Sequence, residues 1–248
     1  MRTIHSQNLW HLSPAMLKVV LVLCLLGVFA GAAQAAKVTY LKIPAQIKKQ
    51  GEARWKVLKM GEEVKTGDSI RTGMGARVEV TLNDKRVFRV GQATEIELPL
   101  LETRNQSVQA RVNLLLGQVW GGLIKPLAQS RGDKFEVATS TAVLGVKGTQ
   151  FNVEYDKLEQ ASTLSVLSGT VAAVPPEPVQ EPVEIAGPRE IAPPQEISED
   201  EWMLLVERDQ KVIIRPGEAP QVVPLTEADK AVEWIQFNLE RDRTLAGE

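Results

Sequence analysis

Short apolar stretches with a two-residue period recur along residues 76–174, spaced about ten residues apart. In the clearest of them Phe151, Val153 and Tyr155 alternate with polar residues, which is the period of a strand with one buried and one wet face. Glycines and turn-forming residues separate the stretches, and none of them shows a convincing helical period. This regularity predicts an all-β domain, either a sandwich or a β-solenoid-like stack.

The apolar positions of these strands are expected to form the core. Burying a Val, Leu, Ile or Phe side chain stabilises a fold by about 1.5–3 kcal/mol, so a set of this size can hold the domain without cross-links after the chain entropy is set against it. The predicted core residues are Val78, Val80, Leu82, Phe88, Ile96, Leu98, Val112, Leu114, Leu116, Phe135, Val137, Phe151, Val153, Leu164, Val166 and Val171.

Two glycine-containing motifs flank the strand at 150–155. The first is Gly145-Val-Lys-Gly-Thr149, in which glycines allow a tight turn or a close backbone approach. The second is Val166-Leu-Ser-Gly-Thr-Val171, in which Ser-Gly is a two-residue hairpin signal. The first motif lacks the Gly-Lys-Ser/Thr order of a phosphate loop and precedes a strand rather than a helix, so a tight β turn is favoured over a nucleotide site.

Upstream, Trp55 is followed by Gly61-Glu-Glu-Val-Lys-Thr-Gly-Asp-Ser-Ile-Arg-Thr-Gly73 and by Leu82-Asn-Asp84. Together with the two later motifs, and in this order, the sequence over about residues 50–174 resembles the FecR domain, whose family is named for the envelope regulator of ferric citrate uptake. The resemblance implies a stacked, solenoid-like β arrangement and therefore favours that alternative over the sandwich. It implies no ligand.

Residues 1–35 have the features of a signal peptide. Arg2 and Lys18 flank a polar lead, residues 19–30 are almost wholly apolar, and Ala33-Gln-Ala35 has the small-x-small form of a cleavage site. We expect cleavage after Ala35 and a periplasmic or secreted protein. An uncleaved anchor, which would keep the protein at the membrane, is the alternative. Leu23 stands where a lipoprotein signal requires a small residue before Cys24, which disfavours lipidation.

Removal of this leader changes the available chemistry. The whole chain has 29 basic and 31 acidic residues; the mature chain keeps 27 and 31, a net charge of −4. His5, His11 and Cys24 all lie in the leader, so the mature chain has no imidazole base, thiol nucleophile, disulfide or His/Cys zinc site. Its mild negative charge disfavours nucleic acid as a partner. We therefore expect a non-enzymatic protein without a metal or small-molecule cofactor.

The remaining chain is expected to divide into three parts: a β domain over 36–174, a Pro/Glu-rich linker or insertion over 175–197, and a β-hairpin and helix over 198–248. The hairpin is predicted from the apolar stretches at 202–206 and 211–215, although Ser198 and Glu201 could instead cap a short helix. The hairpin either belongs to the C-terminal part or returns to the main sheet, which would make the Pro-rich run an insertion.

The last element is predicted to be one amphipathic helix. Thr226 is its N-cap, with Glu227 and Asp229 in the first turn. Its apolar stripe is formed by Ala228, Ala231, Val232, Ile235 and Leu239, widened by Trp234 and Phe237.

Acidic, basic and aromatic residues are the remaining candidates for functional groups. Asp68, Asp84, Asp133, Glu154 and Asp156 could supply a carboxylate pair for glycoside hydrolysis, but acids in turns and on wet strand faces are the ordinary solubility pattern. A Ser–Lys type pair of Lys147 with Thr149 or Ser168 would have side chains that point apart. The arginines between 71 and 111 are expected on a mixed solvated face, with contact to an anionic polymer as the alternative. Trp55, Trp120, Trp202 and Trp234 are expected to pack in the core or between elements rather than stack on sugars.

The favoured function is a non-catalytic exported envelope module that binds a protein or cell-wall partner, in signalling or scaffolding, for example through an open strand edge. No binding residue is assigned. One alternative is a carboxylate-dependent hydrolase of an envelope polysaccharide. Another is the periplasmic part of a FecR-type signal-transduction system; at most 18 residues precede the apolar segment, too few for a cytoplasmic regulatory domain, so a separate chain would have to supply it.

Overall fold

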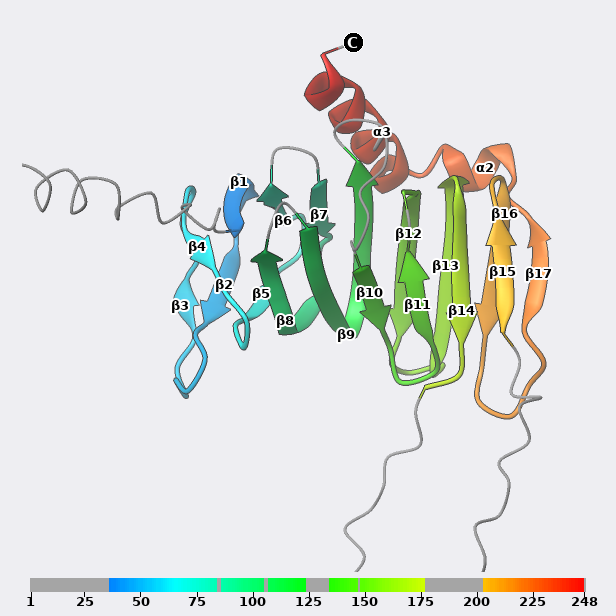
Figure 1. The fold of residues 1–248 in the computed structure, drawn as a ribbon, viewed down its shortest axis with the longest axis horizontal. Coiled ribbons are helices and arrows are strands. Elements are labelled where there is room, and N and C mark those ends of the chain that lie inside the picture. The colour runs from blue at the N-terminus through cyan, green and yellow to red at the C-terminus, as the bar shows by residue number, and fades with distance from the viewer. Residues whose placement is uncertain are drawn as a thin grey trace, which may run out of the picture. The chain divides into compact units, whose positions relative to one another are not determined.

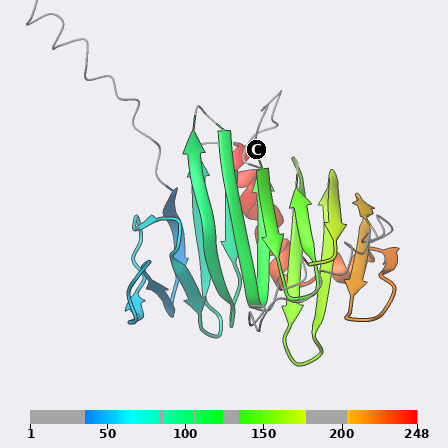
Figure 2. The ribbon, with the colours of Figure 1, turned by 60° about the horizontal axis from the view of Figure 1, so that its bottom comes forward.

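The computed structural model describes residues 36–83, 86–104, 107–123, 134–146, 148–176 and 203–247, which all belong to one compact unit. The described part is mainly β and forms two sheets that share the long strand β9 (Figures 1 and 2). Sheet A contains, in spatial order, β4 (Glu63–Val64), β1 (Ala36–Lys42), β6 (Arg77–Asn83), β7 (Arg86–Val90), the end of β9 (Ser107–Leu123), β12 (Gln150–Asp156), β13 (Ala161–Ser168), β16 (Gln210–Ile214) and β17 (Gln221–Pro224). Sheet B contains β3 (Lys56–Val57), β2 (Ala45–Lys48), β5 (Ser69–Thr72), β8 (Glu95–Arg104), the start of β9, β10 (Lys134–Ala138), β11 (Val143–Val146), β14 (Thr170–Val174) and β15 (Leu204–Glu207).

The two sheets are built up together from one end to the other. Apart from β4 beside β1 and β3 beside β2 at the first end, spatial order follows chain order in both sheets. Neighbouring strands are antiparallel except β9 and β10, which are parallel. The predicted mainly β fold is therefore confirmed, and this progressive order is compatible with the predicted solenoid-like stack.

The core lies between the two sheets. The ring of Phe135 from sheet B lies 6.3 Å from that of Phe88 and 6.2 Å from that of Phe151, both from sheet A. Every predicted core residue belongs to one buried cluster except Leu116. Leu116 is half-buried because the pairing of β8 with β9 shifts register there, beside Gly117 with its left-handed φ of 88°.

Glycines mark the places where the chain passes from one sheet to the other. Gly148 (φ 72°) connects β11 in sheet B to β12 in sheet A, and Gly169 (φ 82°) connects β13 in sheet A to β14 in sheet B. The predicted hairpin at Gly169 is therefore wrong: β14 pairs with β11 and β15, not with β13. A Cβ at Gly169 would lie 2.5 Å from Cγ2 of Thr149, so the two crossings are packed against each other.

The predicted C-terminal hairpin is also divided between the sheets. Its strands are present as β15 and β16, joined by a tight turn at Asp209 (φ 61°), but β15 pairs with β14 in sheet B and β16 with β13 in sheet A. Both strands therefore return to the main sheets. The Pro/Glu-rich residues 177–202, including Trp202, lie outside the described part of the chain.

Two helices replace the predicted single one: α2 (Glu227–Lys230) and α3 (Glu233–Ala246). Thr226 caps α2 through a capping box with Asp229, as the sequence predicts. Helix α3 lies across the outer face of sheet A (Figures 1 and 2). The predicted stripe is partly wrong, because α3 buries Trp234, Ile235, Asn238 and Asp242 while Val232 is exposed. None of the helices within the described ranges has the length and apolar character needed to span a bilayer.

Candidate partner-binding site

The described members of the predicted carboxylate set do not form a pair of free acids. Asp68 is buried and holds a turn by accepting hydrogen bonds from the backbone N–H of Gln50 (3.1 Å) and Lys65 (3.0 Å). Asp156 accepts hydrogen bonds from two N–H groups in the turn after β12. Glu154 is free in the described part of the chain, and Asp84 and Asp133 lie outside it. Among the described members of this set, a single carboxylate is therefore unengaged, whereas glycoside hydrolysis uses two. Within the described ranges, no group of acidic side chains could hold a metal ion.

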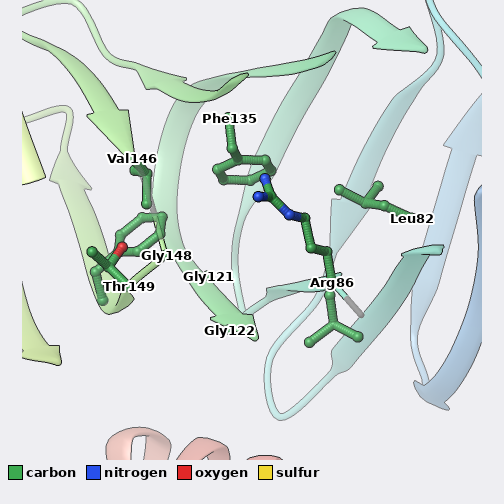
Figure 3. Close-up of a pocket in the computed structure, with 10 residues that line it drawn as sticks. Leu82, Arg86, Gly121, Gly122, Phe135, Val146, Gly148 and Thr149 are labelled. Carbon is green, nitrogen blue, oxygen red and sulfur yellow. The ribbon is translucent and has the colours of Figure 1, made fainter. Parts of the chain in front are cut away.

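The Gly-Val-Lys-Gly-Thr motif lies at a small cavity rather than at a ligand site. Gly148 and Thr149 line it together with Arg86 and Phe135 (Figure 3). The Thr149 hydroxyl is buried without a hydrogen-bond partner among the described residues. The cavity volume of about 20 Å³ holds about one water molecule, far less than a phosphate group needs. The space therefore does not favour a nucleotide site; Lys147 is outside the described residues.

The outer face of sheet A carries a buried charge network instead of the predicted solvated face. Arg89 donates to Glu79 Oε2 (2.7 Å) and to Asp242 Oδ1 (2.6 Å), and all three side chains are at most 4% exposed. Arg241 also donates to Glu79, and the Trp120 indole N–H donates to Asp242 Oδ2. Burial acts to raise the pKa of Glu79, but the hydrogen bonds and charges of Arg241 and Arg89 outweigh it and hold this pKa below its usual range. The network joins α3 to the sheet.

An open apolar groove lies beside β2 and β3, at the N-terminal end of sheet B. Its volume is about 510 Å³. Ile43 and Val57 in its lining are 68% and 65% exposed. The lining residues are Ile43, Pro44, Ala45, Gln46, Val57, Arg71, Thr72 and Gly73. We call this hollow the β3 groove.

The β3 groove borders a strand edge. Among the described residues β3 pairs only with β2, through Gln46 opposite Val57 and Ile47 opposite Lys56. The other edge of β3 therefore presents backbone N–H and C=O groups that can pair with an added strand. Met60, three residues after Val57, and Met74, directly after Gly73, are also largely exposed.

Trp55 lies against one wall of the β3 groove. The guanidinium carbon of Arg71 is 4.3 Å from its ring centroid and the Lys48 ammonium is 5.1 Å away. Arg71 is held by a hydrogen bond from Nε to Gln46 Oε1 (2.7 Å). Trp55 is only half-buried, unlike Trp120 and Trp234, which pack between sheet A and α3 as predicted.

Sequence reasoning missed this site because its residues stand outside the alternating pattern. Ile43 and Val57 occur in a glycine-rich stretch of very short strands, where the two-residue period is too brief to assign a face. The one available signal was Trp55 with basic residues nearby in sequence, Lys48 and Lys56.

Chemically, the β3 groove suits an extended polypeptide. Main-chain pairing at an edge strand supplies affinity, while an adjacent apolar pocket accepts alternate side chains and supplies specificity. The basic side chains of Lys48 and Arg71 add a preference for acidic residues in the bound segment.

Comparisons with known proteins gave one family match and similar solved structures. Residues 68–172 match the family model described as "FecR protein". No curated protein matches the sequence. Two crystal structures of a candidate anti-sigma factor from Parabacteroides distasonis, at 1.65 and 2.50 Å resolution, are similar, each with 20% identity and a TM-score of 0.47 over 68% of this chain. The match spans 64% of that protein, less than two thirds of its length. The family match therefore agrees with the predicted FecR-type domain over residues 68–172.

Proposed function

We propose that this protein is an exported, non-catalytic FecR-type module of the cell envelope that docks a protein partner in a signalling assembly. The partner contributes an extended segment, which adds a strand to the free edge of β3 and places an apolar side chain in the β3 groove. The observation that carries this proposal is the exposed apolar groove of about 510 Å³ directly beside an unpaired strand edge.

Exposure of the groove supports a binding role. Single apolar side chains on a surface are ordinary, but a contiguous apolar hollow with exposed Ile43 and Val57 is typical of an interaction site. A sheet edge beside it is normally protected by charge, proline or a covering element. No described element covers β3, so an added strand has access to it.

Charge around the groove specifies the partner segment. Lys56 is paired with Glu52, whereas Arg71 and Lys48 face the ring of Trp55 and form no ion pair with an acid among the described residues. An extended segment that alternates apolar and acidic residues would satisfy both the pocket and these cations. A separate chain would then carry any signal onward, as in FecR-type systems.

Selection from a library of short linear peptides tests this proposal. The leaderless protein should enrich peptides with alternating apolar and acidic residues. Val57→Asp, which puts a carboxylate at the groove, should abolish their binding, and Trp55→Ala should weaken it. Leu158→Asp is the matched control, because Leu158 is 96% exposed and lies in the turn between β12 and β13, which contributes no residue to the groove. Absence of enriched peptides, or binding that survives Val57→Asp, would contradict the proposal.

A further inference from the structure

A second hollow lies on the outer face of sheet A, next to α2 and α3. Its volume is about 210 Å³. The lining comes from β9, β12, β13 and β16 on the sheet side and from residues 225–235 on the helix side. We call it the helix-side pocket. Its lining residues are Gln118, Asn152, Glu154, Thr163, Ser165, Leu167, Lys211, Leu225, Asp229, Val232, Trp234 and Ile235.

The sheet side of the pocket is polar, and four of its side chains are not engaged by other described residues. Gln118 and Thr163 are the cross-strand neighbours of Glu154 on its two sides, and Ser165 is the neighbour of Asn152. In the part of the chain that the structure describes, the side chains of Gln118, Glu154, Thr163 and Ser165 make no hydrogen bond. Four side chains that can donate or accept therefore face one hollow without partners.

Apart from Asp229, the helix side of the pocket is apolar, and its tryptophan is fixed in place. The indole N–H of Trp234 donates to Asn152 Oδ1 (2.8 Å), and its ring stacks on Phe237 at 6.1 Å. Leu167 and Ile235 pack in the same cluster. An aromatic and aliphatic wall opposite a polar floor suits a ligand with a C–H surface on one side and hydrogen-bonding groups on the other.

Charge in the pocket disfavours an anionic ligand. Its cation, Lys211, is already paired with Asp229 at 2.7 Å. Glu154 contributes an unpaired carboxylate, and burial together with the nearby charge of Asp156 raises the pKa of Glu154. A phosphate or carboxylate group would meet an acid here and no free cation.

We propose that the helix-side pocket binds one neutral sugar residue. Sugar hydroxyls both donate and accept, which matches the amide, the two hydroxyls and the carboxylate of the floor, while the C–H face of the ring matches the wall. The volume corresponds to about seven water molecules, enough for one ring and not for a chain. The ligand is therefore a terminal or side-branch residue of an envelope polysaccharide.

Titration with N-acetylglucosamine and, separately, with glucose tests this proposal, followed by backbone amide NMR of the leaderless protein. Saturable shifts confined to β12, β13 and residues 225–235 with either sugar are expected. Thr163→Val, which removes a hydroxyl, and Glu154→Gln, which replaces a charged acceptor oxygen by an amide donor, should each weaken binding about five- to tenfold. Unchanged circular dichroism checks that the variants fold, and Ser165→Ala replaces either variant that does not.

The proposal is overturned if neither sugar gives saturable shifts, if the variants bind as the wild type does, or if inorganic phosphate shifts the same amides. It does not depend on the β3 groove. Val57→Asp should leave sugar binding unchanged, so failure at one site is distinguishable from failure at the other.

Discussion

The outer face of sheet A and the β3 groove are both surfaces of the same pair of sheets, yet they have opposite character. On sheet A, Arg89 lies buried between the carboxylates of Glu79 and Asp242 under α3. In the β3 groove, Arg71 lies against the half-buried ring of Trp55 beside exposed apolar side chains. One face is covered by the chain's own C-terminal helix, and no described element covers the other.

The two surfaces differ in whether their charged side chains are paired within the chain. A buried charge is tolerated only when partners offset its desolvation, and on sheet A the buried charges of Glu79, Arg89 and Asp242 each have at least two partners. That face therefore contributes to stability and specifies the position of α3. The groove contributes little to stability, which leaves its residues available for a partner.

The largest expected effect is the loss of a buried charge. Arg89→Met leaves Glu79 and Asp242 buried without their common partner and should lower the free energy of unfolding by about 3–5 kcal/mol. Arg71→Met, the matched change in the groove, should cost less than about 1 kcal/mol. Urea unfolding of both variants measures the two losses of unfolding free energy. Equal losses would contradict the difference between the two surfaces.

Alanine substitutions at two adjacent glycines of β9 should distinguish the packing of the core from the packing of α3 on sheet A. A Cβ at Gly121 would lie 2.1 Å from the Phe151 ring, inside the core, and one at Gly122 would lie 2.8 Å from Asp242 Oδ1, under α3. Gly121→Ala should cost about 1–3 kcal/mol of global stability, since a packed ring must move. Gly122→Ala should have a smaller global effect and should speed hydrogen exchange in α3. Faster exchange in α3 for Gly121→Ala alone would contradict this assignment.

Acid should lower the stability contributed by the helix-covered face of sheet A and leave the β3 groove unaffected. The pKa of Glu79 is held below its usual 4.5, and a hydrogen bond from Lys211 is the main cause that lowers the pKa of Asp229 to about 2. Groups with depressed folded-state pKa values stabilise the fold fully above their unfolded values and lose that contribution as pH falls through the folded ones. The urea midpoint should therefore hold from about pH 7 to 5 and fall below about pH 4.5.

Asp229→Asn is the control for that prediction. It removes one of the two titrating groups, so its urea midpoint should fall less steeply between pH values of about 4 and 2. A midpoint that rises on acidification, or a slope identical to that of the wild type, would show that these carboxylates are not the cause.

The strands and core were predictable because the two-residue period is a local property. Val78, Val80 and Leu82 alternate visibly, and all three are buried. The sequence could not show which polar strand faces remain exposed to solvent in the folded protein. Glu79 and Asn152 read as solvated, and they are buried because a helix more than 80 residues later covers them.

The same limit explains the errors in the helix and at the turns. The apolar stripe of α3 omitted Asn238 and Asp242, since their burial depends on Arg89 and Trp120 from distant strands. Ser168-Gly169 has the local chemistry of a hairpin, but pairing between strands decides that the chain crosses to the other sheet there. The β3 groove was not predicted at all, because it arises where short strands end.

Site-specific photo-crosslinking in the intact envelope tests the central claim most directly. A photoreactive residue at position 57 of the exported protein should give a discrete crosslink to one protein, within a segment that alternates apolar and acidic residues. The same residue at position 158, in the turn between β12 and β13, should give none. Crosslinks of equal yield from both positions, or none from position 57, would contradict the claim that the β3 groove receives a protein partner.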